Sequence, residues 1–376
     1  MTFPSLVVLS CVLHLVLGIR LVPALGQPLA GTLLAVLLVV SAVLMPAGLV
    51  ARRWLRPPAS DWLTWVGMVC MGLFSSLAVL ALLRELVLLG AWLATLGGAV
   101  IDAGQLHAWS ARAVVALALA GSVLGFANAR RTAAVRRVQV RIPGLPAALQ
   151  GLRIVQITDI HVGPTIKVAY LQAIVDRVNA LQPDVIAVTG DIVDGSVPEL
   201  QAHVAPLGTL RARHGSYFVT GNHEYYAGVH AWTREMQRLG LHVLHNSHVV
   251  LQHGDGQLVL AGVPDYGAHH FDEAHRSDPA AALAGAPGNA PRVLLAHQPR
   301  TAPAASAAGF DLQLSGHTHG GQFFPWSFFV PLQQPYTAGL HRLGGLQVYV
   351  SRGTGYWGPP KRLFAPSEIA EITLVG

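Results

Sequence analysis

Charged side chains are scarce in this sequence. Asp, Glu, Lys and Arg make up 12% of its 376 residues, whereas hydrophobic residues make up 52%. An ordinary soluble protein contains about 25% charged residues, so this composition indicates that part of the chain lies in a membrane. A wholly soluble protein is therefore excluded.

Cysteine is also scarce, and the patterns typical of nucleic-acid binding are missing. The two cysteines, Cys11 and Cys70, both lie in apolar segments, so no disulfide framework indicates an oxidising compartment. Basic residues do not alternate with aromatic residues, and no basic helix is evident. The formal charge of +6 therefore indicates arginines at a membrane surface, and we expect no nucleic-acid partner.

Acidic residues and lysine are nearly absent before about residue 128, which predicts a domain boundary there. We expect residues 1–129 to form a transmembrane anchor of about four helices, because its apolar segments are long enough to cross a hydrocarbon layer of about 30 Å. The run Leu86–Ile101 either prolongs the third helix or lies at the membrane interface. The expected spans are residues 3–25, 29–50, 62–83 and 106–127.

Arginines predict the topology of the anchor. One cluster follows the second span and consists of Arg52, Arg53 and Arg56. The other begins an expected basic juxtamembrane linker, residues 130–150, and consists of Arg130, Arg131, Arg136 and Arg137. Short loops rich in arginine tend to remain in the cytoplasm, so an even number of spans should separate the clusters. We therefore expect the amino terminus and everything after residue 130 to be cytoplasmic, although Arg20 in the first outer loop opposes this rule.

Short apolar segments after residue 151 each end in polar residues. A predicted strand in "LRIVQITDIH" is followed by a predicted helix and by a second strand in "PDVIAVTGDIVDG". The same ending recurs in "GSYFVTGNHEYY", "PRVLLAHQP" and "FDLQLSGHTHGG". Since α/β folds build their sites at the carboxyl ends of strands, residues 151–376 are predicted to form a layered α/β sandwich with added antiparallel hairpins.

These strand ends supply carboxylates, an amide and imidazoles, but no thiolate. Mixed oxygen and nitrogen donors are typical of catalytic Mn²⁺, Fe or Zn²⁺, whereas structural zinc usually has cysteine ligands. The candidates are too many for one ion, and a bridging carboxylate would divide them between two ions about 3.5–4 Å apart. Glycines beside the last two histidines permit the tight turn that such a division needs. The candidate ligands are Asp159, His161, Asp191, Asn222, His297, His317 and His319.

The segments "TDIH", "TGDIVD", "GNHE", "AHQP" and "SGHTHGGQ" resemble, in this order, the motifs of the calcineurin-like metallophosphoesterases. The resemblance covers about residues 150–376. Within it, "SGHTHGGQ" together with "SRGTGYWGPP" is similar to the bacterial branch in which a membrane anchor precedes the catalytic domain. It implies two β-sheets flanked by helices. It also implies a first ion bound by Asp159, His161, Asp191 and His319, and a second bound by Asp191, Asn222, His297 and His317.

In this resemblance Asp191 bridges the ions, and His223 is not a ligand but a catalytic acid or charge stabiliser near the leaving group. A water between the ions would lose a proton near neutral pH and attack the phosphorus of a monoester or diester in line. Glu224 replaces an aspartate that many relatives carry, and we expect it to leave the metals untouched.

The expected function is a dinuclear-metal-dependent phosphohydrolase, anchored by several spans in the bacterial inner membrane, with a phosphate ester as substrate. Two alternatives stay open. One is a pyrophosphatase acting on a nucleotide-diphosphate lipid such as UDP-diacylglucosamine. The other is a membrane sensor or scaffold that binds without turnover. The sequence does not distinguish among Mn, Fe and Zn.

Several other residues keep two interpretations. The run "FFPWSFFVPL", residues 323–332, either fills the core or forms an apolar lip that enters the bilayer near a lipid phosphate. Asp194 either orients a ligand or caps a turn, and Arg352 either contacts substrate phosphate or braces its loop. The remaining histidines of this part match no motif and are interpreted as surface or loop residues: His203, His214, His230, His242, His245, His248, His253, His269, His270, His275 and His341.

Overall fold

The computed structural model describes residues 3–376, which form two compact units. One unit contains the described residues up to Asn128 together with Gly358–Leu363, and the other contains Ala129–Trp357 and Phe364–Gly376. The chain therefore passes from one unit to the other at 128/129, 357/358 and 363/364.

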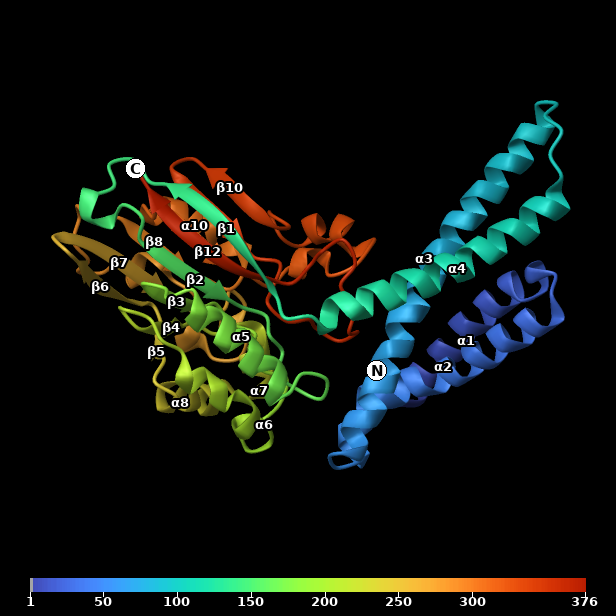
Figure 1. The fold of residues 1–376 in the computed structure, drawn as a ribbon, viewed down its shortest axis with the longest axis horizontal. Coiled ribbons are helices and arrows are strands. Elements are labelled where there is room, and N and C mark those ends of the chain that lie inside the picture. Colours follow the sequence, from blue (N-terminus) through green and yellow to red (C-terminus); the bar gives the residue numbers. More distant parts are fainter. Residues whose placement is uncertain (1–2) are drawn as a thin grey trace. The chain divides into compact units, whose positions relative to one another are not determined.

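The first unit is built mainly from long helices (Figure 1). They are α1 (Phe3–Leu21), α2 (Pro28–Trp54), α3 (Ala59–Leu96) and α4 (Ala103–Arg130). All four are long and apolar enough to cross a membrane, by length and composition. Of the run Leu86–Ile101, which had two interpretations from the sequence, the part up to Leu96 prolongs α3.

Helices α2 and α3 approach each other closely at two glycines. A Cβ atom added to Gly67 would lie 2.8 Å from the Cα atom of Gly48. Thr64 also donates a hydrogen bond from its hydroxyl to the carbonyl oxygen of Gly48, at 3.2 Å. Small residues allow helix backbones to approach in this way, so they determine this contact.

Residues 358–363 return to the helical unit late in the chain. The Nζ atom of Lys361 donates to the carbonyl oxygen of Gly72 in α3 at 2.9 Å and to the hydroxyl of Ser122 in α4 at 3.0 Å. The side chain of Asn128 donates to the carbonyl oxygen of Arg362 at 3.2 Å. Polar bonds to two helices therefore hold this short segment in place.

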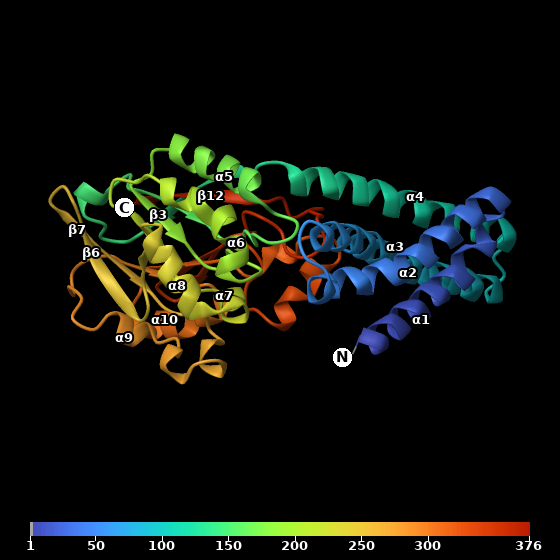
Figure 2. The ribbon, with the colours of Figure 1, turned by 90° about the horizontal axis from the view of Figure 1, so that it is seen from below.

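The second unit contains two six-stranded mixed sheets (Figures 1 and 2). The first sheet has the order β1-β12-β2-β3-β4-β5, and the second has the order β10-β11-β9-β8-β7-β6. The strands of the first sheet are β1 (Ala134–Arg141), β12 (Glu368–Val375), β2 (Arg153–Ile157), β3 (Val185–Val188), β4 (Ser216–Phe218) and β5 (His242–Val243). Those of the second are β10 (Gly339–Leu343), β11 (Leu346–Val350), β9 (Leu312–Ser315), β8 (Arg292–Leu295), β7 (Gly256–Gly262) and β6 (Ser247–His253).

Neighbouring residues of a strand face opposite layers, as the pleat of a strand requires. In β2, Ile154 lies in the core between the two sheets with Leu260 and Leu314 of the second sheet. The next residue, Val155, lies in the outer core. That outer core also contains residues of α5 (Val168–Ala180), α6 (Val197–Val204) and α8 (Val229–Arg238).

The outer face of the second sheet packs against α9 (Pro279–Ala282) and α10 (Ala302–Ala308). The layers are thus helices, sheet, sheet and helices. This confirms the predicted α/β sandwich of two sheets flanked by helices.

Residues 134–141, which lie in the expected juxtamembrane linker, form strand β1. This strand pairs in parallel with β12, from Ala134 opposite Glu368 to Arg141 opposite Val375. Val140 is buried between the sheets, whereas Arg137 is exposed and forms an ion pair with Glu371 at 2.9 Å. Some of the arginines counted as juxtamembrane therefore belong to a strand of the second unit.

Candidate metal centre

Loops that follow strands of both sheets meet at the candidate metal centre. The strands β2, β3 and β4 are parallel neighbours in the first sheet, as are β8 and β9 in the second. The carboxyl ends of parallel strands lie at one edge of their sheet. The loops at these ends contain all the sequence-predicted ligands, and Asn222 begins helix α7 (Asn222–Ala227) after β4.

One group of potential ligands consists of Asp159, His161 and His319, all buried. The Nε2 atoms of the two histidines are 3.0 Å apart, and Nε2 of His319 is 3.5 Å from Oδ1 of Asp159. Atoms bound at about 2.0–2.1 Å to one ion lie about 3.0–3.4 Å apart, so these three side chains fit a common cation.

A second group consists of Asp191, His297 and His317. Nε2 of His297 is 3.1 Å from Oδ2 of Asp191 and 3.2 Å from Nδ1 of His317. His297 donates from Nδ1 to the carbonyl oxygen of Thr189 at 2.8 Å, and this bond leaves its Nε2 atom for a ligand. Burial, together with the charge of His297, lowers the pKa of His317 to about 3, which keeps this imidazole neutral as a metal ligand must be.

Two buried oxygen atoms indicate that a cation belongs in the site. Within the described residues, Oδ1 of Asn222 is buried and accepts no hydrogen bond. Leaving such an atom unpaired costs about 1–3 kcal/mol, which coordination to a metal would avoid. Burial also raises the pKa of Asp159, and this influence exceeds the opposite effect of the charge of His297. A bound cation would compensate the carboxylate that burial disfavours, so the donors present fit divalent metal ions.

The backbone at the ligands is strained in a consistent way. Five of the seven candidate ligands have φ angles in the left-handed region, at 53° for Asp159, 57° for His161, 52° for Asp191, 70° for His317 and 51° for His319. Non-glycine residues seldom adopt such angles, and they cluster at functional sites. Gly316 has a different role, because a Cβ atom there would lie 2.1 Å from a carboxylate oxygen of Asp159.

Asp194 links two histidines of the site. Its Oδ1 atom is 3.0 Å from Nδ1 of His161 and 2.6 Å from Nδ1 of His223. These three side chains also lie close enough to hold an ion. However, Nε2 of His161 faces His319, so a carboxylate that orients a ligating histidine explains the contacts better. Of the two interpretations of Asp194, the structure favours the orienting one.

His223 is held beside the ligands. Its backbone N–H donates to Oδ1 of Asp191 at 2.8 Å, and its Nε2 atom is 4.0 Å from Oδ2 of the same residue. Burial lowers the pKa of His223, but the hydrogen bond with Asp194 and the charges of Asp191 and Asp194 outweigh this and raise it to about 9. The imidazole is therefore protonated near neutral pH and can donate a proton.

Glu224 anchors the backbone beneath Asp191. It is fully buried, and its carboxylate accepts hydrogen bonds from the N–H groups of Gly221, Asp191 and Ile192 at 2.7, 3.0 and 2.8 Å. From the sequence, only the place of Glu224 in "GNHE" was known, and these contacts could not be predicted. Glu224 thus positions the turn that presents Asp191.

Two exposed aromatic side chains flank His223. The ring centroids of Tyr226 and Trp357 lie 5.3 and 5.8 Å from that of His223, and both side chains are exposed. Gln322 exchanges two hydrogen bonds of 2.8 Å with the backbone of Trp357. Trp357 belongs to the segment "SRGTGYWGPP", but its place beside His223 was not predicted from the sequence.

The contacts of Arg352 and the exposure of the aromatic run, residues 323–332, bear on their two interpretations. Arg352 forms an ion pair with Glu368 at 3.1 Å, which agrees with the bracing interpretation rather than with a free phosphate contact. In the run after His319, Phe323 is buried, but Phe328 is 71% and Phe329 51% exposed. Most of this run therefore does not fill the core.

The chain resembles known proteins along most of its length. A family model described as calcineurin-like phosphoesterase matches residues 152–321. The chain is 38% identical over 325 residues to the "Transmembrane protein with metallophosphoesterase domain" of Bos taurus, covering 82% of this chain and 73% of that protein. It is 41% identical over 261 residues to the protein of the same name from Danio rerio, covering 67% of this chain and 60% of that one.

A bacterial relative is an uncharacterized metallophosphoesterase of Campylobacter jejuni, 36% identical over 252 residues, with 66% of this chain and 65% of that protein covered. The chain thus spans less than two thirds of the Danio rerio and Campylobacter jejuni proteins. The apolar helices and the relatives named as transmembrane proteins indicate that the chain is membrane-associated. By the family match and by these relatives, the chain belongs to the calcineurin-like phosphoesterases, a family of metal-dependent phosphoester hydrolases.

Proposed function

We propose that this protein is a membrane-anchored phosphohydrolase with two divalent metal ions. The observation that supports this most strongly is the approach of two ligand groups at one site, together with the buried, unpaired Oδ1 atom of Asn222, the residue before His223. The first ion takes Asp159, His161, Asp191 and His319. The second takes Asp191, Asn222, His297 and His317, so Asp191 belongs to both.

Two divalent ions at such a site supply an activated water and positive charge for the phosphoryl group. The protein supplies the remaining requirements. His223, protonated near neutral pH, donates a proton to the departing oxygen. Asp194 keeps the rings of His161 and His223 in orientation through its hydrogen bonds to both. Tyr226 and Trp357 border the space next to His223 and restrict how a substrate approaches it.

This proposal is tested with the full-length protein in detergent. We expect hydrolysis of a bis-nitrophenyl phosphodiester and of nitrophenyl phosphate to disappear after chelation and to return when Mn²⁺, Fe²⁺ or Zn²⁺ is added. The relative rates on the two esters would establish the preference for diesters or monoesters. A metal-loaded, folded protein that hydrolyses neither these esters nor a diphosphate-linked lipid would refute the proposal and favour a sensor or scaffold.

The exposed aromatic run favours a second candidate, a pyrophosphatase acting on a nucleotide-diphosphate lipid. Phe328, Phe329 and Leu332 are 71%, 51% and 79% exposed and follow His319 closely in the sequence. Aromatic side chains favour the boundary between lipid headgroups and water. A rate on a nucleotide-diphosphate lipid in mixed micelles that greatly exceeds the rates on both nitrophenyl esters would select this candidate.

We propose four crossings of a bacterial inner membrane, with the second unit in the cytoplasm. The arginines at the ends of α2 and α4 would then lie on the same, cytoplasmic side. Arg20, which opposed this arrangement, forms an ion pair with Glu85, so its charge is compensated within the helical unit. A fluorescent reporter fused to the carboxyl terminus should be active, whereas an alkaline phosphatase fusion should be inactive. The reverse result would mean that the number of crossings is odd.

A further inference from the structure

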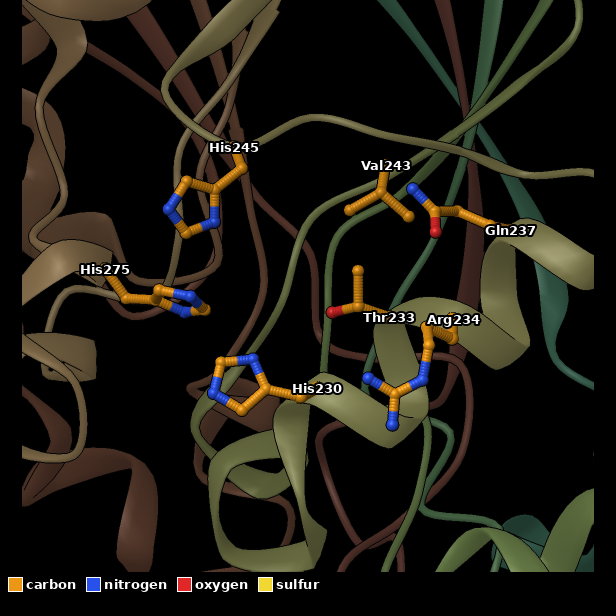
Figure 3. A pocket seen from close by; sticks show the side chains of 7 residues that line it. All are labelled: His230, Thr233, Arg234, Gln237, Val243, His245 and His275. Atoms are coloured by element: carbon orange, nitrogen blue, oxygen red, sulfur yellow. The ribbon is translucent and has the colours of Figure 1, made fainter.

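A second group of histidines and a carboxylate lies outside the candidate metal centre (Figure 3). His230 is in the first turn of α8, His245 is in the loop between β5 and β6, and Asp272 and His275 belong to the loop before α9. Three of these residues, with others from α8, line a pocket of about 330 Å³, and the rings of His230, His245 and His275 lie along one side of it. From the sequence alone, these histidines were interpreted as surface or loop residues.

The distances within this histidine pocket suit a tetrahedral ion. Oδ2 of Asp272 is 3.5 Å from Nε2 of His230 and 3.6 Å from Nε2 of His275. Bonds of about 2.0–2.1 Å in a tetrahedral site place the ligand atoms about 3.3–3.4 Å apart, so only small movements are needed. The spacing is similar to that of the ligand groups of the candidate metal centre, where atom pairs are 3.0–3.5 Å apart.

His275 has the support that a metal ligand requires. Its Nδ1 atom is 2.8 Å from the hydroxyl of Tyr225, so the other ring nitrogen, Nε2, is directed to Asp272. A ligating histidine typically bonds through its second nitrogen in this way, which fixes its tautomer and orientation.

His245 can complete the ligand set. Its ring centroid is 4.2 Å from that of His275, and its edge-on orientation brings it over the same side of the pocket. Arg234, which follows His230 by one turn of α8, lies across the pocket from His245 (Figure 3). Imidazoles with a single carboxylate suit Zn²⁺ and similar transition metals, whereas Mg²⁺ and Ca²⁺ require mostly oxygen ligands.

We propose that His230, Asp272 and His275 bind a third metal ion of the zinc type, with His245 as the fourth ligand. This ion would join the loop before α9 to α8. Through Tyr225 it would also contact α7, the helix that begins with Asn222 and His223. The site is separate from the phosphoesterase ligands, so the proposal does not depend on the proposed function.

The test is a count of tightly bound zinc ions on the full-length protein in detergent. The protein is first stripped with a chelator and then titrated with Zn²⁺ against a chromophoric competitor. We expect one more ion on the wild type than on His230→Ala or Asp272→Asn. The affinity lost for that ion should exceed the 10- to 100-fold typical of changes to residues behind the ligands. Cobalt bound in place of this zinc should show the visible absorption of a four-coordinate ion, and His230→Ala should abolish that signal.

The controls separate this site from the phosphoesterase centre and from chance binding. His242→Ala removes an exposed histidine outside the pocket and should bind as many ions as the wild type. His317→Ala should lose an ion but retain the four-coordinate cobalt signal. The His230 side chain is 65% exposed, so His230→Ala should unfold at the same temperature as the wild type when zinc is absent. Equal ion counts for the wild type and His230→Ala, or an equal loss in His242→Ala, would overturn the proposal.

Discussion

Replacing His317 with alanine is expected to lower the bound metal content and to reduce hydrolysis of every phosphoester. His317 lies 3.2 Å from Nε2 of His297 and belongs to the ligand group of Asp191, so its loss removes a donor from the second ion. Replacing His223 with alanine should leave the metal content unchanged and slow hydrolysis about 10²- to 10⁴-fold, the usual effect of losing a positioned acid. Elemental analysis of both variants, measured together with their rates, checks this difference.

The leaving group provides a second measurement on His223→Ala. A nitrophenolate departs readily without a proton, whereas an alkoxide needs one. The variant should therefore lose much less activity on a nitrophenyl ester than on an alkyl phosphodiester. Equal losses on both esters, or a missing metal ion, would show that His223 is a ligand or binds the phosphate oxygens.

Replacing Asp191 with asparagine is expected to lower turnover far more than replacing Asp194 with asparagine. Asp191 is buried, is 3.1 Å from His297 and is the residue assigned to both ions, so both ions lose a negatively charged ligand. Asp194 contacts two histidines but belongs to neither four-residue set, and such supporting residues typically contribute 10- to 100-fold. Steady-state rates at saturating metal should show a loss above about 100-fold for Asp191→Asn and within that range for Asp194→Asn.

The two variants serve as controls for each other, because each exchanges one carboxylate for an amide of the same size. Asp194→Asn should also lower the pKa of His223, since the hydrogen bond from Asp194 is one cause of its value of about 9. The protonated form of His223 would then be lost at a lower pH. The basic limb of the plot of rate against pH should therefore shift to lower pH. Equal turnover of the two variants would reject the bridging role of Asp191.

The proximity of the candidate ligands could be predicted from the sequence, because these residues follow strands. Once Asp159, Asp191 and His297 are placed after buried parallel strands, the geometry of a sheet brings them together. The fold class followed from the same strands and is confirmed. The assigned roles of the ligands and of His223 remain predictions until the variants above are measured.

Other features could not be predicted, because they depend on partners that are distant in the chain. Strand β1 pairs with β12, which lies at the other end of the sequence. No local pattern in residues 134–141 predicts that partner. Glu224 has a local motif, but its bonds to the backbone of Asp191 and Ile192 arise only when two loops meet. In the histidine pocket, His230 and His275 belong to separate elements, so their spacing in the sequence resembles that of no metal motif.

The return of residues 358–363 to the helical unit has a consequence for biosynthesis. Helices α1 to α4 are made first, but the amine of Lys361, which bonds to both α3 and α4, appears only when nearly the whole chain has been translated. Until then, the carbonyl oxygen of Gly72 and the hydroxyl of Ser122 lack this donor. The helical unit therefore reaches its final form only after every strand of the two sheets except β12 has been synthesised. A fragment that begins at Ala134 would contain Lys361, four residues after Trp357, without the two helices to which it bonds.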